Sequence, residues 1–295
     1  MSRRDSLRLD WRRDNIRFLR AHYEQACRAP PKGAHEWLSL DVGGRLIRLL
    51  IHDAAAPSDR AIIYFHGGGW IVGSPSTHAD ITSALAATTG LPVISVDYRL
   101  APEFVAEDMI SDGLAVLRHF LGRYESAILC GDSAGGALAL AVECNAGELK
   151  EDIIGVASFY GCFGLWANAA LHQASAVSDG LDTLSVRRYW QAANRSQGLS
   201  PYSIPALAHA QGCPVHLLIA GRDPLCRDSL ALANALKEKG RPVTIDMQAF
   251  ADHSFLQDPR LHRARENAYR GIADWICALN SARPEARHRR RSSGR

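Results

Sequence analysis

The sequence lacks any long apolar run and any pair of cysteines at the spacing used by metal sites and redox motifs. No window approaches the roughly 18 consecutive apolar residues that a membrane-spanning helix needs. The seven cysteines are odd in number, scattered, and never arranged as Cys-x-x-Cys. This argues against a disulfide framework or a zinc site and favours reduced thiols in the cytoplasm. We therefore expect a cytoplasmic protein with no membrane span and no metal.

The sequence also has little net charge, +3 at pH 7, although its arginines crowd both ends. The N-terminal run mixes arginine with aspartate and carries apolar residues at helical spacing, which predicts an amphipathic helix rather than a transit peptide. The tail from about Ser281 has too few apolar residues to order itself by burial. Because it has no interleaved aromatic residues for base stacking, we interpret it as solvated and expect no nucleic-acid partner.

Strand-like and helix-like runs alternate through most of the chain. Two strand-like runs, 35–42 and 45–52, flank Gly43-Gly44, which indicates a hairpin. Later apolar runs are continuous and separated by helical segments, a pattern typical of a parallel sheet between two helix layers. The predicted later strands lie near 61–65, 92–98, 127–130, 153–160, 214–220 and 243–250, and the predicted helices near 79–89, 107–121, 134–148, 229–239 and 263–279. Residues 161–210 break this alternation without a strand, as a lid or binding subdomain does.

The stretch Gly131-Asp132-Ser133-Ala134-Gly135 has the pattern Gly-x-Ser-x-Gly. It follows a strand-like run that ends at Cys130 and precedes a helical run. A serine on such a turn is held in a strained backbone with its hydroxyl exposed, and the flanking glycines prevent collisions with strand and helix. The pattern predicts that Ser133 is a nucleophile; the alternative is a glycine-rich turn that only caps a helix.

A serine nucleophile needs a base, and the base needs an acid to orient it. In hydrolases with this turn the order along the chain is serine, acid, histidine. Asp223 follows one later strand-like run and His253 follows the next. Asp228 and Asp252 are rival acids, but we expect Asp228 to lie within a helix and Asp252 to be too close in sequence to His253.

Three consecutive glycines follow His66 after another strand-like run. Backbone N–H groups aimed at a developing oxyanion are worth about 2.7–4 kcal/mol each in the transition state. The N–H of Ala134, at a helix start, is one predicted donor. We expect the bare backbone of the loop His66–Gly69 to supply the others, and the His66 ring to anchor that loop through hydrogen bonds.

The motifs "HGGGW", "YRLAPE", "GDSAGG", "GRDPL" and "DHSF", in this order, resemble those of the hormone-sensitive-lipase-like branch of the α/β-hydrolases. The similarity extends from about Trp37 to Leu279. It implies the α/β-hydrolase fold, with a mostly parallel eight-stranded sheet flanked by helices and a helical cap. The implied divisions are cap segments 1–36 and 161–210, a catalytic core of 37–160 and 211–280, and a disordered basic tail 281–295.

The resemblance implies a serine carboxylesterase that needs no metal or organic cofactor and acts on a small-molecule ester. Its implied site consists of a triad and an oxyanion hole: Ser133, Asp223 and His253, with Gly67, Gly68 and Ala134. Members often pair their subunits, so the resemblance allows a homodimer, but the residues themselves leave the oligomeric state open. In "YRLAPE" we expect Asp97, Arg99 and Glu103 to have structural roles, because this segment buttresses the nucleophile loop from behind in the family.

Substrate choice is the least determined part of the prediction. Trp70, Phe163 and Trp166 either line an acyl pocket or belong to the core of the cap. A short-to-medium-chain ester is the expected substrate, since no long lipid-anchoring segment is present. An amidase or formamidase with the same triad is an alternative, and a non-catalytic binding protein is another, against which the presence of His253 weighs.

The sequence also departs from the family pattern near the site. Arg222 replaces the usual acidic residue before the catalytic aspartate, and Ser254 replaces the usual glycine after the histidine. A third departure is Phe104-Val105-Ala106, where the family usually continues with a proline-rich stretch. We expect these changes to affect substrate choice more than reaction type.

Overall fold

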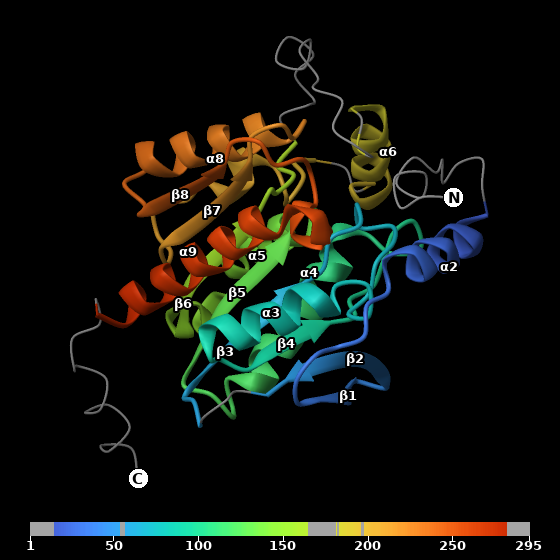
Figure 1. The fold of residues 1–295 in the computed structure, drawn as a ribbon, viewed down its shortest axis with the longest axis horizontal. Helices are drawn as coiled ribbons and strands as arrows, with labels where there is room; N and C mark the ends of the chain where they lie inside the picture. The colour runs from blue at the N-terminus through green and yellow to red at the C-terminus, as the bar shows by residue number, and fades with distance from the viewer. Residues whose placement is uncertain (1–14, 54–56, 165–180, 182, 196–197, 282–295) are drawn as a thin grey trace.

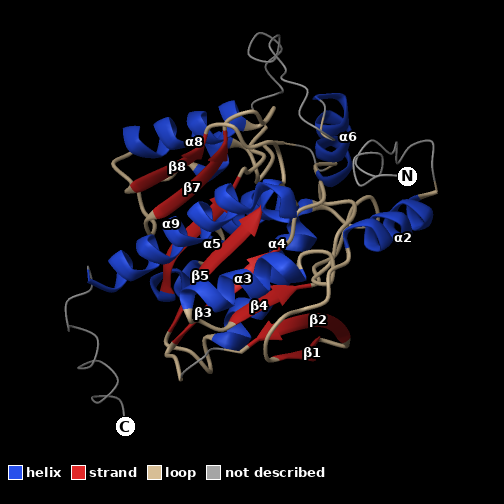
Figure 2. Ribbon diagram, in the orientation of Figure 1, coloured by secondary structure: helices blue, strands red, loops and turns tan. Residues whose placement is uncertain are grey.

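A computed structural model of the protein describes residues 15–53, 57–164, 181, 183–195 and 198–281. Its centre is an eight-stranded sheet in the order β1-β2-β4-β3-β5-β6-β7-β8, with helices on both faces (Figures 1 and 2). The strands are β1 His35–Val42, β2 Arg45–His52, β3 Arg60–Phe65, β4 Val93–Val96, β5 Ser126–Asp132, β6 Ile153–Phe159, β7 Val215–Ala220 and β8 Val243–Gln248. From β4 to β8 all pairings are parallel, whereas β2 is antiparallel to both neighbours. The predicted mostly parallel eight-stranded sheet is confirmed.

The predicted hairpin at the first two strands is also present. Gly43 and Gly44 have φ values of 61° and 85°, a left-handed pair that glycine adopts readily and that suits a tight hairpin turn. The Gly44 N–H donates to Oδ1 of Asp41 at 2.8 Å, which closes the turn. This hairpin starts the sheet at one edge.

The central strands are buried on both faces because helices cover each side. Along β3, Ala61, Ile63 and Phe65 belong to one apolar cluster, whereas Ile62 and Tyr64 belong to another. This alternation is what the two-residue period of a strand requires when both faces meet a core. The sequence pattern of continuous apolar runs therefore reflects a sheet between two cores.

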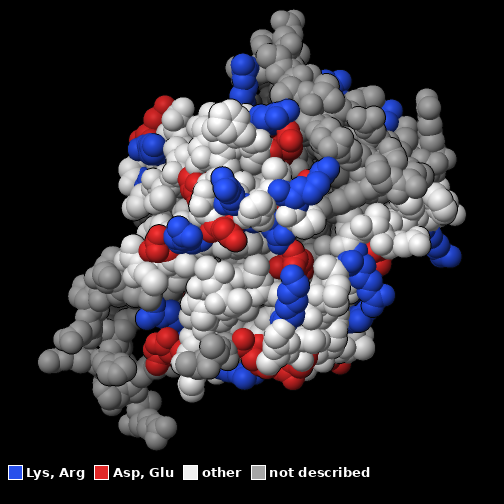
Figure 3. Space-filling model, viewed as in Figure 1, with Lys and Arg blue, Asp and Glu red and all other residues white. Residues whose placement is uncertain are grey.

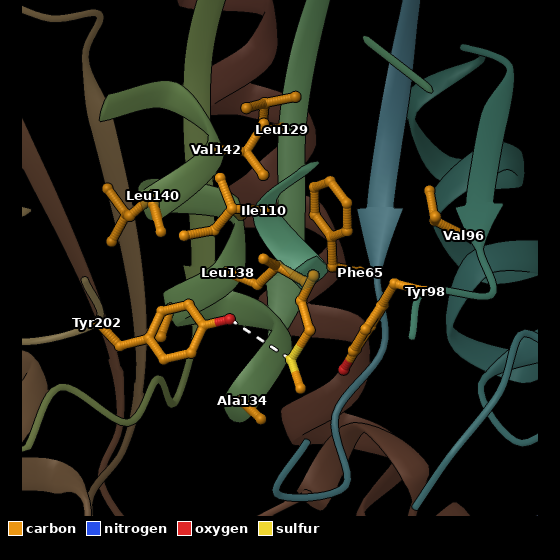
Figure 4. Packing of buried hydrophobic residues seen from close by; sticks show 14 of the residues in the cluster. Phe65, Val96, Tyr98, Ile110, Leu129, Ala134, Leu138, Leu140, Val142 and Tyr202 are labelled. Atoms are coloured by element: carbon orange, nitrogen blue, oxygen red, sulfur yellow. Dashed lines mark hydrogen bonds between the residues drawn. The ribbon is translucent and has the colours of Figure 1, made fainter. Parts of the chain in front are cut away.

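Each helix layer supplies one of these two cores. Helices α4 Ala106–Phe120, α5 Ala134–Cys144 and α8 Cys226–Glu238 pack into the first cluster, part of which Figure 4 shows. Helices α3 Ala79–Thr89 and α9 His262–Ser281 pack into the second.

Three further helices lie in the segments predicted to form a cap, and each adds buried residues to the first apolar cluster. They are α2 Ile16–Cys27, α6 Thr183–Ala193 and α7 Ile204–Leu207. Figure 1 shows α2 and α6 at the end of the molecule toward which β5 points. Much of the predicted cap and all of the tail beyond Ser281 lie outside the described residues, so the proposed domain boundaries stay a prediction.

The surface in Figure 3 carries lysine and arginine interspersed with aspartate and glutamate, with no extended patch of one sign on the described part of that face. Within the described ranges, no helix has the length and apolar character needed to cross a bilayer.

Candidate active site

Ser133 lies on a sharp turn between the end of β5 and the start of α5. Its φ and ψ are 53° and −118°, a strained conformation for a residue with a side chain. A Cβ atom on Gly131 would collide with the carbonyl of Gly135, and one on Gly135 with the carbonyl of Phe65. The two flanking glycines are therefore required by close backbone contacts, as the sequence predicted.

The structure brings Ser133, His253 and Asp223 together, although they lie far apart in the sequence. Nε2 of His253 is 3.0 Å from Oγ of Ser133, and Nδ1 of His253 is 2.7 Å from Oδ2 of Asp223. The Asp223 carboxylate is fully buried, and its Oδ1 accepts the N–H of Leu225 at 2.8 Å. Asp223 and His253 follow β7 and β8, which end at the same edge of the parallel sheet as β5.

The two rival acids have other partners. Asp228 lies on α8, and its Oδ2 accepts the N–H of Phe163 at 2.7 Å. Asp252 forms an ion pair with Arg222, with Nε and Oδ1 separated by 3.6 Å. Arg222, one of the departures from the family pattern, thus has its charge paired at the surface.

Ser254 adopts the left-handed conformation with φ 59° and ψ 26°, which explains why glycine suits this position. Serine is more strained than glycine in this conformation, yet Nε2 of His253 still lies within hydrogen-bond distance of Oγ of Ser133. The ring of Tyr160 meets the His253 ring edge-on, with centroids 5.2 Å apart, and fixes one side of the imidazole.

The glycine loop differs from the prediction in one respect. The N–H of Gly67 donates to Oδ1 of Asp132 at 2.8 Å, so it is not free to bind a substrate oxygen. The prediction of Gly67 as an oxyanion donor is therefore wrong. Gly68 and Gly69, by contrast, line the cavity above Ser133 together with Ala134.

Asp132, the residue before Ser133, connects the nucleophile turn to the glycine loop through its bond with the N–H of Gly67. Its Oδ1 also accepts the hydroxyl of Tyr64 at 2.6 Å, and its Oδ2 lies 3.5 Å from Nε2 of His78. Burial by itself would raise the pKa of Asp132, but His78 and the hydrogen bonds from Tyr64 and Gly67 hold that pKa below its ordinary value. A buried carboxylate thus fixes the spacing between the two loops.

His66 anchors the glycine loop, as expected. Its Nδ1 donates to the carbonyl of Gly67 at 2.8 Å, and its own carbonyl accepts the hydroxyl of Tyr98 at 2.6 Å. Burial lowers the pKa of His66 to about 3, so the ring is neutral at physiological pH. The Tyr98 ring stacks on it at 4.3 Å.

The "YRLAPE" segment supports different elements from those expected. Arg99 binds the carboxylates of Asp108 and Asp112 on α4, and Glu103 binds Arg20 on α2. These residues have structural roles, as predicted. Their partners, however, are α4 and the cap helix α2 rather than the nucleophile turn.

Comparison with known proteins identifies the fold. The family model described as the alpha/beta hydrolase fold matches residues 62–257. The chain belongs to the α/β-hydrolases. An esterase from Pyrobaculum calidifontis is similar in structure with a TM-score of 0.80 and 23% identity, over 95% of this chain and 98% of that one. An esterase from the bacterial hormone-sensitive lipase family gives a TM-score of 0.80 and 24% identity, over 93% and 94% of the two chains.

A cavity lies above Ser133 in this hydrolase. Its walls beyond the glycine loop and the Ser133–His253 pair are mainly apolar or aromatic, and neither lysine nor arginine lines its described part. The apolar and aromatic wall residues are Tyr23, Trp70, Val72, Cys162, Leu181, Val186, Tyr189 and Leu225, and Asp132, Ala134 and Ser254 complete the described lining.

The predicted substrate-binding residues have three different outcomes. Trp70 lines the cavity, where its ring stacks on Tyr202 at 5.0 Å. Phe163 does not line the cavity and is buried in the apolar core, so of its two predicted alternatives the structure favours the core over the acyl pocket. Trp166 lies outside the described residues. Tyr23, on the predicted N-terminal amphipathic helix, lines the cavity but was not among the predicted wall residues.

No group of three histidine, cysteine or acidic residues within the described ranges is arranged to hold a metal ion. The described site brings together a hydroxyl, an imidazole and a carboxylate beside backbone N–H groups. Such an arrangement is suited to acyl transfer.

Proposed function

We propose that this α/β-hydrolase is a serine carboxylesterase that acts through an acyl-serine intermediate. The observation that carries the proposal is the unbroken chain of contacts from Ser133 Oγ through His253 to Asp223, with distances of 3.0 and 2.7 Å. Esterases are among the solved structures that share its fold. The absence of disulfide bonds among the seven cysteines, all of which lie within the described residues, supports a cytoplasmic location.

In the proposed reaction, Nε2 of His253 accepts the Ser133 proton while Oγ attacks the ester carbonyl carbon. When the tetrahedral intermediate collapses, the bond to the leaving alcohol breaks and His253 gives that oxygen its proton. Water then gives a proton to His253 as its oxygen attacks the acyl-serine carbonyl. When this second intermediate collapses, the bond from the acyl carbon to Oγ breaks, the acid leaves, and His253 returns the proton to Oγ of Ser133. Asp223 accepts the Nδ1–H throughout and stabilises the imidazolium.

We propose that the N–H groups of Gly68, Gly69 and Ala134 form the oxyanion hole. The N–H groups of the two glycines are not used by any hydrogen bond of the described residues, whereas that of Gly67 is occupied by Asp132. Ala134 begins α5, so the helix dipole strengthens its N–H as a donor.

The proposed substrate is a neutral ester with a short-to-medium acyl chain. An apolar wall without lysine or arginine in its described part favours an uncharged acyl group over a carboxylate or phosphate. Because the same atoms also suit amide hydrolysis, the test has to compare the two bonds directly.

The test is a chain-length panel of nitrophenyl esters with matched nitroanilides, assayed on the wild type and Ser133→Ala. We expect ester hydrolysis that exceeds anilide hydrolysis at every chain length. The Ser133→Ala variant should retain less than about a thousandth of the activity while keeping its thermal unfolding midpoint. Preferential cleavage of anilides would establish an amidase, and activity retained by Ser133→Ala would place the nucleophile elsewhere.

A further inference from the structure

The cap helix α2 is bound directly to the loop that carries the proposed oxyanion donors. Arg20 donates from Nε to the carbonyl of Ile71 at 2.9 Å and from Nη2 to the carbonyl of Ala101 at 2.8 Å. The Glu103 carboxylate holds the same guanidinium at 2.9 and 2.7 Å. Charge-assisted hydrogen bonds of this kind are both stronger and more directional than neutral ones.

A second contact lies one helical turn further along α2. Oε2 of Glu24 accepts the hydroxyl of Ser74 at 2.7 Å. On the same helix, Leu19 and Tyr23 are buried and only 3% exposed, and Tyr23 lines the cavity. Helix α2 therefore holds the 68–74 loop at two points while Tyr23 supplies part of the cavity wall.

The Ile71 carbonyl, which accepts a hydrogen bond from Arg20, lies in the same turn as the proposed oxyanion donors Gly68 and Gly69. The carbonyl of Gly68 accepts the N–H groups of Ile71 and Val72, both at 3.1 Å, so residues 68–72 form a tight hydrogen-bonded turn. The carbonyl of Trp70 accepts the N–H of Ala101 at 2.8 Å. This bond connects the turn to the segment around Ala101, whose carbonyl Arg20 also contacts. A shift of the Ile71 carbonyl would therefore reorient the peptide groups before it.

We infer that Arg20 and Glu24 are positioning residues that fix the direction of the Gly68 and Gly69 N–H groups. The helix α2 thereby contributes to transition-state stabilisation without any contact with the reacting atoms. This inference rests on the proposed function for its kinetic consequence, and on the hydrogen bonds alone for its structural one.

The kinetic test compares Arg20→Gln with Arg17→Gln, which removes the same charge from an exposed position one turn earlier on α2. A misplacement of about 1 Å can cost roughly a hundredfold in rate, so we expect kcat of Arg20→Gln to fall at least about tenfold with little change in KM. Glu24→Gln should show a smaller loss of the same kind. Arg17→Gln should stay within about twofold of the wild type, since an exposed charge contributes little.

A second measurement separates this inference from the proposed function. Amide hydrogen exchange of the peptide covering residues 66–74 should be faster in Arg20→Gln than in the wild type or Arg17→Gln, while β6 stays protected in all three. If the wild type hydrolyses no ester, the proposed function fails and the exchange result alone decides the inference. Unchanged exchange of the loop in Arg20→Gln, or a loss confined to KM, would overturn it.

Discussion

Two features of the structure require glycine at position 69: its left-handed backbone conformation and its close contact with the cap helix α6. Its φ is 61°, and a Cβ atom there would lie 2.5 Å from Cγ of Tyr189. Gly90, at the end of α3, has a similar φ of 69° but no neighbour within 4 Å of such a Cβ. Both positions have the left-handed backbone that favours glycine, but only at Gly69 would a Cβ atom also collide with a neighbouring side chain.

We predict that Gly69→Ala lowers kcat/KM at least about a hundredfold, because the methyl group displaces either the Tyr189 ring or a proposed oxyanion donor. Gly90→Ala should lose only about 1–2 kcal/mol of unfolding free energy from the left-handed backbone and keep its activity. Steady-state kinetics and urea unfolding of both variants measure this. Equal activities in the two variants would contradict it.

The sequence alone predicted which residues meet at the site better than it predicted which N–H groups are free. The Gly-x-Ser-x-Gly turn and the order of strands are enough to bring Ser133, Asp223 and His253 to one edge of a parallel sheet. The choice between Gly67 and Gly69 as a donor depends on where the Asp132 carboxylate points, and that is a tertiary contact. No spacing along the chain encodes it.

At the scale of elements, α6 covers the proposed site from above. Tyr189 packs on Gly69 and lines the cavity with Val186, whereas the neighbouring Trp190 packs edge-on against Trp70, at 5.8 Å, and does not line the cavity. Of these two adjacent residues of α6, Tyr189 therefore forms part of the cavity wall, whereas Trp190 supports the wall residue Trp70.

We predict that Tyr189→Ala widens the range of acyl chains that the cavity accepts. Each further methylene that is buried is worth about 0.8 kcal/mol, or roughly fourfold in kcat/KM. The ratio of kcat/KM for octanoate over butyrate nitrophenyl esters should therefore rise about tenfold or more. Trp190→Ala, which loses a comparable aromatic surface outside the cavity lining, should leave this ratio within about threefold; an equal rise in both variants would assign the effect to general loosening of α6.

The elements themselves were largely predictable, since buried strands appear as continuous apolar runs and helices as periodic ones. An exception is α5, which was predicted to continue to about Glu148 but ends at Cys144. Gly147 has a φ of 55°, and the chain there continues as a 3-10 helix, Gly147–Asp152, instead. A glycine in the left-handed region interrupts the helix where apolar periodicity alone suggested continuation.

Across the whole molecule, several buried titratable groups have pKa values that make folding sensitive to acid. Burial lowers the pKa of His52 to about 4, of His66 to about 3 and of His216 to about 4. Burial raises the pKa of Asp97 to about 6. In the unfolded chain these side chains titrate near about 6.5 for histidine and 3.9 for aspartate.

The sign of the effect follows from proton binding near pH 5. There the three histidines bind protons only when unfolded, whereas Asp97 binds one only when folded, which leaves about two more protons on the unfolded state. We predict that these four groups reduce the unfolding free energy by about 3 kcal/mol per pH unit as the pH falls from 6 toward 4. Urea unfolding at a series of pH values measures this slope.

A single substitution isolates one contribution to the slope. His216 lies in β7 with its ring centroid 5.3 Å from that of Trp275. His216→Phe should reduce the slope by about 1.4 kcal/mol per pH unit, the value of one proton. His262→Phe, at an exposed position, should leave the slope unchanged. A slope that is the same in wild type and His216→Phe would contradict the assignment.

The measurement that most directly tests the proposed triad is intact-protein and peptide mass spectrometry after treatment with a serine-directed phosphonate. If His253 activates Ser133 across the 3.0 Å contact, the wild type gains one adduct, on the peptide that carries Ser133. Ser133→Ala should gain none, and His253→Ala should react at least about a hundredfold more slowly. An unlabelled wild type, or an adduct on another residue, would contradict the account.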